Sequence, residues 1–179
     1  MRAFPRQGFL PPAQWRFAAL DLPLSIGLGQ TCSQPSAVRR MLELLEVCPG
    51  QHVLDVGSGS GWTTALLAHL VGPTGSVLGV ELEPTLAERG RANVAATGLS
   101  WTRLVTAEPG TLGWPEEAPY DRILVGAEAA EVPAELMDQL AVEGVMVVPV
   151  AGRMLQVRTS PGAPVAVTSE GRYRFVPLR

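Results

Sequence analysis

The residues best suited to chemistry lie in the stretch LDVGSGSGW (54 to 62) and at Glu81. Gly57, Gly59 and Gly61 stand at alternate positions, so the backbone can turn sharply and a ligand can approach the main chain without meeting a Cβ atom. A helix that begins directly after such a loop offers free amide donors to an anionic group. Glu81, twenty residues beyond Gly61, can accept hydrogen bonds from both hydroxyls of a ribose. The pattern therefore indicates an adenosine-containing ligand.

Asp55 decides between two ligand classes that share this geometry. Dinucleotide sites favour GxGxxG, whereas this loop has GxGxG with Asp55 two residues before its first glycine. A carboxylate there suits a ligand that carries an ammonium and a sulfonium, and it would repel a pyrophosphate. We therefore predict S-adenosylmethionine as the cofactor and S-adenosylhomocysteine as its product. The alternatives are a nicotinamide cofactor, and a glycine-rich turn that merely closes a strand-helix unit.

The elements that must position this loop alternate along the chain. After an irregular lead-in of about thirty residues, Val38, Met41, Leu42 and Leu45 predict a helix ended by Pro49 and Gly50. Short apolar strands are then predicted at 52–56, 76–80, 102–106, 123–127 and 145–150. Helices are predicted between them at 62–71, at 84–97 with Gly98 as cap, and at 133–141. Such strands require a parallel sheet covered on both faces.

The tail changes character after residue 150. It reads MLQVRTS, PGAP, VAVTS, EG and RYRFVPL, and strands joined by such short turns must be antiparallel. We therefore predict a Rossmann-like, doubly wound α/β fold of the class I methyltransferase type, with a mostly parallel sheet and antiparallel C-terminal strands. The expected single domain, 1–179, comprises a lead-in and substrate loop (1–36), a cofactor-binding core (37–150) and the C-terminal strands (151–179).

Composition narrows the possible partners. The 179 residues are 46% hydrophobic and 17% charged, with a formal net charge of −3, which allows one sizeable core and provides no basic field for nucleic acid. Cys32 and Cys48 form neither a metal-ligand pattern nor a disulfide framework. No signal peptide or membrane-spanning stretch is apparent. We expect a soluble cytoplasmic protein that binds neither nucleic acid nor membranes. The sequence carries no signal for an oligomeric state.

From GFLPP onward the chain resembles the protein-L-isoaspartate O-methyltransferases over nearly its whole length. The IGxGQTxSxP segment is specific to that family, whereas glycine loops are common to many methyltransferases. The matching segments are PLSIGLGQTCSQPS (23 to 36), VLDVGSGSGWTTALLAHLVG (53 to 72), GTLGW (110 to 114), APYDRILVGAEA (118 to 129), VPAELMDQL (132 to 140), VVPV (147 to 150) and FVPL (175 to 178).

The resemblance implies roles for particular residues. The 23–36 segment would be a substrate-side loop that places Thr31 and Ser33 beside the methyl group and the substrate carboxylate. The loop from Gly126 to Ala129, with Ala127 in it, and the tail around Val176 would flank the damaged peptide. We expect Ser33, Thr31 and Asp55 to be catalytic. The expected cofactor-binding residues are Asp55, Gly57, Ser58, Gly59, Gly61, Trp62, Glu81, Leu82, Glu108 and Gly110.

The expected reaction needs few parts. A side-chain carboxylate, with an ordinary pKa of about 4, is already ionised at neutral pH, so its attack on a sulfonium methyl needs neither a general base nor a metal. Positioning by hydroxyls and backbone amides is then the main task. Trp62 either shields the cofactor or packs in the core. The expected substrate is an L-isoaspartyl residue in a damaged protein or peptide, whose methylation initiates its return to aspartate through a succinimide.

Several positions depart from the family pattern. Glu108 and Pro109 precede Gly110 where the family usually carries Gly-Asp-Gly, so Glu108 is expected to substitute for the acid that meets the adenine amino group. Ser36 stands in place of a common histidine. Glu128 replaces a small residue and would repel an anionic substrate unless its side chain points away. The helical segment usual before GFLPP is missing, so we expect a shortened member.

Two other functions follow from these departures. A relative with a changed acceptor, another carboxylate or a small molecule, is suggested by Glu128, Ser36 and the shortened N-terminus. A non-catalytic protein that binds the cofactor, or has lost even that, is suggested by Pro109. A nicotinamide-dependent oxidoreductase is the most distant alternative.

Overall fold

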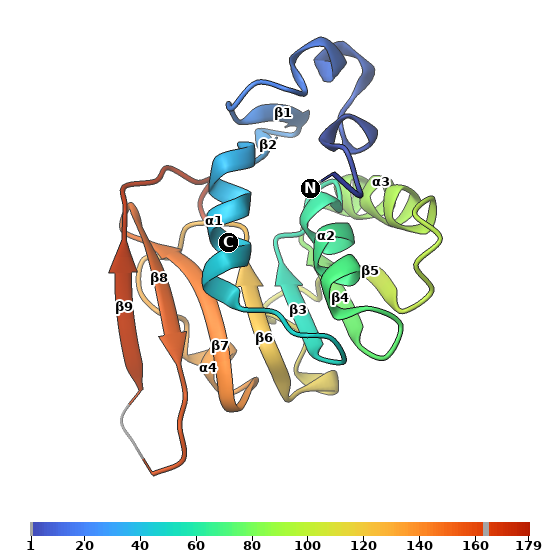
Figure 1. Cartoon of the computed structure of the whole chain (residues 1–179). Coiled ribbons are helices and arrows are strands. Elements are labelled where there is room, and N and C mark those ends of the chain that lie inside the picture. The colour runs from blue at the N-terminus through green and yellow to red at the C-terminus, as the bar shows by residue number, and fades with distance from the viewer. Residues whose placement is uncertain (1, 163–164) are drawn as a thin grey trace.

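The computed structural model describes residues 2–162 and 165–179 (Figure 1). Its centre is a seven-stranded sheet in the order β5-β4-β3-β6-β7-β8-β9. The first five strands in this order are parallel and the last two pairings are antiparallel. The strands are β3 (His52–Val56), β4 (Ser76–Glu81), β5 (Thr102–Thr106), β6 (Tyr120–Val125), β7 (Leu140–Val150), β8 (Arg153–Arg158) and β9 (Ala166–Glu170). The predicted fold class is confirmed.

Apolar side chains cover both faces of the sheet. On one face, Val53 and Leu124 pack with residues of α1 (Pro35–Leu45) and α2 (Trp62–Val71). On the other face, Leu54 and Ile123 pack around Leu136 of the short helix α4 (Ala134–Met137). Figure 1 shows α1 and α2 in front of the sheet. Because neighbouring residues of each strand point to opposite faces, burial on both sides explains the continuous apolar runs of the sequence.

The helix predictions hold best near the glycine loop, which we define as residues 57–61. Helix α2 spans the ten residues predicted for it, and α3 (Pro84–Ala95) ends two residues before the predicted end. Helix α1 ends at Leu45, because Glu46 adopts a left-handed conformation, and so stops before the predicted limit at Pro49. None of the helices in the described part of the chain has the length and apolar character that crossing a membrane requires.

The predicted helix at 133–141 is wrong over its second half. Helix α4 ends at Met137, and Leu140 already pairs with Tyr120 of the sheet. The side chain of buried Gln139 explains the early end. Its amide donates to Leu112 O at 2.8 Å and Glu135 O at 2.9 Å, and it accepts from Trp114 N at 2.8 Å. Two of these bonds pair backbone groups of the loop before β6, and they hold Gln139 outside the helix. Strand β6 also begins and ends earlier than the predicted 123–127, which leaves Gly126 and Ala127 in the following loop.

The lead-in is more ordered than predicted. It contains two 3-10 helices, η1 (Arg6–Phe9) and η2 (Pro12–Phe17), and an antiparallel hairpin of β1 (Leu24–Gly27) and β2 (Gln30–Cys32). The guanidinium of Arg6, which is 4% exposed, holds these pieces together. It donates to Leu22 O at 2.8 Å and Cys32 O at 2.6 Å. Figure 1 shows the hairpin beyond the carboxyl ends of β3 and β6.

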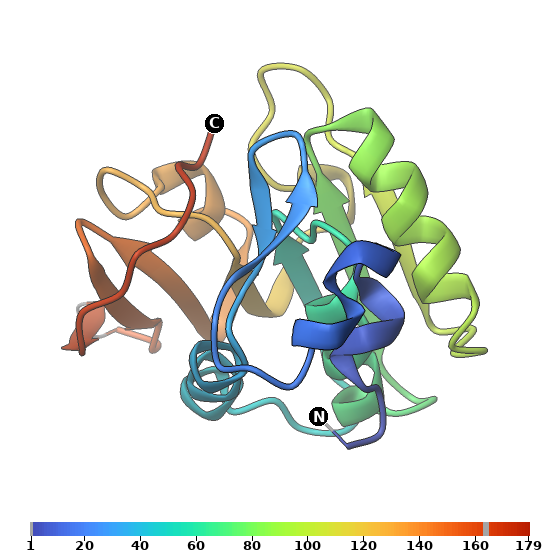
Figure 2. The ribbon, with the colours of Figure 1, turned by 90° about the horizontal axis from the view of Figure 1, so that it is seen from above.

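The last predicted strand is wrong. Strands β8 and β9 are antiparallel as expected, but residues 172–178 form no strand of the sheet within the described residues. They make one isolated parallel bridge, between Pro177 and Glu128. Of the predicted PGAP turn, Pro161 and Gly162 form a turn, and residues 163 and 164 lie outside the described residues. The segment 172–179, which we call the tail, crosses the carboxyl end of the sheet and passes beside the β1-β2 hairpin in Figure 2.

Helix α3 approaches the glycine loop closely at Gly90. A Cβ atom there would lie 2.7 Å from Gly59 O and 2.7 Å from Leu104 Cδ1. One helical turn further on, the Asn93 side-chain amide donates to Ser60 O at 3.0 Å. The absence of a side chain at Gly90 therefore lets α3 pack directly on the loop.

We expect Gly90→Ala to destabilise the protein. Alanine favours a helix by about 1 kcal/mol over glycine, but overlap with a backbone carbonyl and a packed leucine costs about 1–3 kcal/mol, so the overlap should prevail. Urea denaturation measures the free energy of unfolding. Gly8→Ala is the matched control, because nothing lies within 4 Å of its Cβ position. A Gly90→Ala protein as stable as the wild type would contradict this packing argument.

Candidate active site

The glycine loop is fastened to the end of the neighbouring strand. Gly57 N and Ser58 N donate to Val80 O at 2.9 and 3.1 Å. The Glu81 carboxylate accepts from Gly59 N at 2.8 Å through Oε2 and from Glu83 N at 2.9 Å through Oε1. Glu81 is only 6% exposed. One buried carboxylate therefore sets the position of the loop after β3 relative to the turn after β4.

A cavity of about 410 Å³ opens above this arrangement, and we call it the glycine-loop cavity. It lies at the carboxyl ends of parallel strands, where open α/β sheets bind ligands. Six of the predicted cofactor-binding residues line it: Gly57, Gly59, Glu81, Leu82, Glu108 and Gly110. The predicted substrate residues Gly126, Ala127 and Val176 line it as well. The structure thus gathers residues from widely separated parts of the chain around one space.

The β1-β2 hairpin covers one side of the glycine-loop cavity. Ile26 and Gln30 line the cavity, and a Cβ atom at Gly59 would lie 3.2 Å from Ile26 Cδ1. The Arg89 guanidinium of α3 donates to Ile26 O at 2.8 Å. With Arg6 holding β2 from the other side, the hairpin is fastened at both of its strands.

A second cavity of about 470 Å³ adjoins the first, and we call it the tail cavity. Ser33 lines it together with Gln34 and tail residues 172–176. Thr31, Gly126 and Val176 line both cavities. These three residues therefore mark a common boundary, at which a group held in one cavity can meet a group held in the other.

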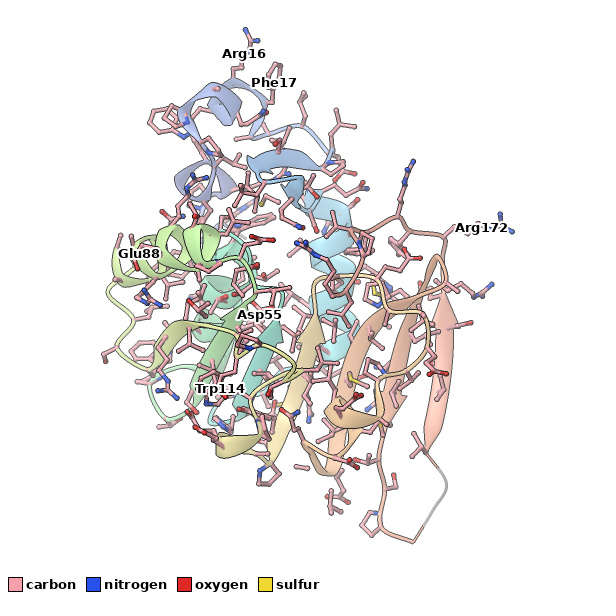
Figure 3. All side chains as sticks on the ribbon, turned by 180° about the vertical axis from the view of Figure 1, so that it is seen from behind. Arg16, Phe17, Asp55, Glu88, Trp114 and Arg172 are labelled. Carbon is pink, nitrogen blue, oxygen red and sulfur yellow. The ribbon has the colours of Figure 1, made fainter. Side chains whose placement is uncertain are left out.

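Asp55 lies beneath the glycine loop and does not line either cavity. Its carboxylate is fully buried, with Oδ2 accepting from Thr64 Oγ1 at 2.7 Å and Oδ1 lacking a partner among the described residues. Figure 3 shows it in the interior of the molecule. Burial raises the pKa of Asp55 to about 6, the Thr64 hydroxyl opposes that rise and the nearby charge of Glu81 adds to it. Contact with a ligand in the glycine-loop cavity would require an opening in the loop above it.

Three further predicted cofactor residues also lie off the cavity wall. Ser58 is buried and its hydroxyl has no partner among the described residues. Gly61 has a φ of +85° and faces Gly90 and Val94 of α3. Trp62 is 3% exposed, packs against the lead-in and donates from Nε1 to Phe4 O at 3.0 Å. Of the two predictions for Trp62, the structure places it in the core.

Glu128 points away from both cavities. Its carboxylate accepts from Gly152 N at 3.1 Å and from Phe175 N at 3.5 Å. Its backbone N–H donates to Val176 O at 2.7 Å, and its carbonyl accepts from Leu178 N at 2.8 Å. The side chain and backbone of this one residue therefore hold the tail in place. The repulsion expected between Glu128 and an anionic substrate does not arise in this arrangement.

Sequence reasoning missed several residues of the two cavities. Leu178 and Arg179 line the glycine-loop cavity, and Arg179 forms an ion pair with Glu83 at 2.7 Å. Arg172, Tyr173 and Arg174 line the tail cavity. Because residues 172–178 were predicted to be a strand of the sheet, these residues were not expected to line a cavity. Gln30 could have been found, since it lies inside the IGxGQTxSxP segment.

The chain resembles one family in both sequence and structure. Residues 1–179 match the family model described as Protein-L-isoaspartate(D-aspartate) O-methyltransferase. A protein named protein-L-isoaspartate O-methyltransferase from Aeropyrum pernix is 45% identical over 99% of this chain and 70% of its own length. One of the same name from Methanopyrus kandleri is 44% identical over 99% of this chain and 80% of its own length.

Solved structures show the same likeness. A structure titled protein-L-isoaspartate O-methyltransferase superposes with a TM-score of 0.87 and 27% identity, over 99% of this chain; this chain spans 60% of the length of that one. A putative protein-L-isoaspartate O-methyltransferase from Plasmodium falciparum, solved with S-adenosyl-L-homocysteine, has a TM-score of 0.81 and 23% identity, over 97% of this chain and 85% of its own. The second likeness concerns the fold alone.

The raised pKa of Asp55 predicts a pH-dependent loss of stability. Because the folded protein holds this proton to about pH 6 and the unfolded chain only to about pH 4, wild-type stability should fall as pH rises between these values. The full effect is on the order of 3 kcal/mol. Asp55→Asn removes the titration. The unfolding free energy of the variant minus that of the wild type should therefore rise by that amount between pH 4 and pH 7. Urea denaturation at several pH values measures the difference.

Asp138→Asn supplies the control for this series, because Asp138 is exposed on the surface. Its unfolding free energy should run parallel to that of the wild type over the same pH range. An Asp55→Asn curve that also runs parallel would refute the pKa shift assigned to the buried carboxylate.

Proposed function

The chain belongs to the protein-L-isoaspartate O-methyltransferase family, and we propose on that basis that it methylates L-isoaspartyl side-chain carboxylates in damaged proteins and peptides, using S-adenosylmethionine. Esterification of that carboxylate initiates its return to aspartate through a succinimide. The observation that carries the proposal is the boundary at Thr31, Gly126 and Val176, shared by the glycine-loop cavity and the tail cavity. A methyl donor in the first cavity and an acceptor in the second would meet there.

The residues of the glycine-loop cavity fit the cofactor. Its volume falls in the usual range for small-molecule sites. Each oxygen of Glu81 accepts one backbone N–H and keeps a lone pair for a ribose hydroxyl. Leu82 offers apolar surface to the adenine, and Glu108 stands where an acid can accept from its amino group. Asp55 Oδ1 and Ser58 Oγ are buried and have no partner among the described residues. The negative charge of Asp55 beneath the loop would favour a cationic methionine moiety in the cavity above it.

The reaction asks for positioning more than for acid-base chemistry. When bound, S-adenosylmethionine supplies a methyl group activated by its sulfonium. The acceptor carboxylate is ionised at neutral pH, since its ordinary pKa is about 4, so no side chain has to remove a proton. We assign Ser33 and Thr31 to donate hydrogen bonds that fix its orientation. Holding two reactants in this way replaces a bimolecular encounter by an oriented one.

Among the described residues that line the tail cavity, none is an aspartate or glutamate that would oppose an anionic substrate. Glu128 is engaged by the tail and by Gly152 N, and Ser36 lies outside both cavities. Two sequence departures that suggested a changed acceptor therefore leave the tail cavity suited to a carboxylate. This favours isoaspartyl substrates over the alternative acceptors. A cytoplasmic location accords with Cys32 and Cys48, both free thiols.

The direct test is methylation of matched peptides. Purified protein should transfer labelled methyl from S-adenosylmethionine to an L-isoaspartyl peptide and not to its L-aspartyl twin. Release of S-adenosylhomocysteine gives a second readout with a panel of other carboxylates. Equal labelling of the two peptides would indicate a changed acceptor. Binding of S-adenosylhomocysteine without turnover on any carboxylate would indicate a non-catalytic relative.

The two cavities predict separable mutational effects. Glu81→Gln should weaken binding of S-adenosylhomocysteine about tenfold or more, because a charge-assisted hydrogen bond contributes on the order of 1.5–3 kcal/mol. Ser33→Ala should lower kcat while that binding stays nearly intact. Calorimetry and initial-rate kinetics measure the two effects. Ser25→Ala is the matched control, since Ser25 lies in the hairpin that directly precedes Ser33, is exposed and lines neither cavity. Full activity of Ser33→Ala would overturn its assignment.

A further inference from the structure

We propose that Arg172 and Arg174 form a cationic rim on the tail cavity, which selects isoaspartyl peptides with acidic residues beside the methylated one. The inference rests on the proposed function and deepens it by naming a substrate class. The positive charge of the rim is not a property of the whole chain, which carries a formal net charge of −3. The rim is a local feature of the tail.

The charge of the tail cavity has one sign. Among the described residues that line it, Arg172 and Arg174 are charged, and the lining includes no aspartate or glutamate. The remaining polar side chains include Thr31, Ser33 and Gln34, which are neutral. A peptide that enters this cavity with its isoaspartyl carboxylate therefore meets two cations and no opposing anion.

The path of the tail directs these two side chains outward. Tyr173 and Phe175 pack against the core cluster around Met41 and Val147, and Tyr173 N donates to Gly152 O at 2.9 Å. In an extended segment, successive side chains point to opposite sides. Arg172 and Arg174 therefore point away from that core cluster, and both are exposed. Figure 3 shows Arg172 reaching outward from the edge of the molecule.

The rim arginines are free to bind, unlike many other arginines of the surface. Arg40 pairs with Glu43 and Glu170, Arg158 with Glu46, and Arg179 with Glu83. Arg172 and Arg174 have no ion-pair or hydrogen-bond partner within residues 2–162 and 165–179.

Two acids close to the tail, Glu170 and Glu128, are already engaged in other contacts. Glu170 precedes Arg172 by two residues and bonds Arg40. Glu128 lies under the tail, where it accepts from Gly152 N and Phe175 N. Neither acid neutralises the rim.

A guanidinium binds a carboxylate through two parallel N–H donors, so each rim arginine can recognise one acidic side chain or a terminal carboxylate. Exposed pairs of this kind are weak, and we expect a gain of about two- to fivefold in kcat/KM for each acidic residue engaged. Because such charges are screened by salt, the gain should shrink as ionic strength rises. The rim therefore acts on the choice among isoaspartyl peptides.

The test uses three peptides with one isoaspartyl site and flanking residues that are glutamate, glutamine or lysine. The wild type should prefer the glutamate peptide to the glutamine peptide by about four- to twenty-five-fold in kcat/KM if both arginines are engaged. The double variant Arg172→Gln/Arg174→Gln should reduce this ratio to near one. Arg16→Gln removes the same charge from the exposed lead-in, at the far edge of the molecule in Figure 3, and should keep the wild-type ratio.

Several outcomes would overturn the rim. The first is that the wild type uses the glutamate and glutamine peptides equally. The second is that the double variant keeps the preference for glutamate. The third is that Arg16→Gln also abolishes that preference. If the wild type methylates no isoaspartyl peptide, the proposed function fails separately. The rim can then be tested without turnover. Fluorescence anisotropy measures how tightly the same three peptides, now labelled, bind to protein that holds S-adenosylhomocysteine. Calorimetry with S-adenosylhomocysteine alone checks that the double variant keeps its cofactor cavity.

Discussion

The two hydrogen bonds of the Glu81 carboxylate are the constraint on which the site depends. They join Gly59 N of the glycine loop to Glu83 N at the start of α3, so the ends of β3 and β4 are fixed relative to each other. The parallel register of these strands brings both turns to one edge of the sheet. Gly90 then allows α3 to rest on the loop. Because each oxygen of this buried carboxylate keeps a lone pair, Glu81 is at once a structural fastening and, in the proposed function, a binding group for the cofactor.

The second requirement is that the acceptor reaches the same edge, and distant parts of the chain provide it. The β1-β2 hairpin precedes the sheet and the tail follows it, yet Thr31 and Val176 both stand on the boundary between the two cavities. Each segment is held by few residues. Arg6 and Arg89 fasten the hairpin, and Glu128 fastens the tail. The surface that we propose to contact the acceptor is thus attached to the sheet by a few residues, and its chemistry can vary while the glycine-loop cavity stays the same.

The sequence predicted best where short-range chemistry decides the structure. β3, α2, β4 and Glu81 were recognisable because apolar periodicity, glycine spacing and one acid all act within about thirty residues. The lead-in and the tail depend on long-range contacts that no local pattern shows. Arg6 bonds carbonyls of residues 20, 22 and 32. The alternation in RYRFVPL is typical of a sheet strand, yet in the described part of the chain this segment makes a single isolated bridge, at Pro177. The early end of α4 likewise depends on long-range contacts, namely the bonds of the Gln139 side chain to Leu112 O and Trp114 N. Family resemblance, rather than periodicity, drew attention to Ser33 and Val176.

In the proposed function the two cavities hold donor and acceptor on either side of Thr31, Gly126 and Val176. A crystal structure with S-adenosylhomocysteine bound tests it most directly. We expect the ribose hydroxyls at Glu81, the adenine between Leu82 and Glu108, and the sulfur atom beside the shared boundary, facing the tail cavity. A nucleoside bound outside the glycine-loop cavity, or one whose sulfur faces away from the tail cavity, would rule out this arrangement of donor and acceptor.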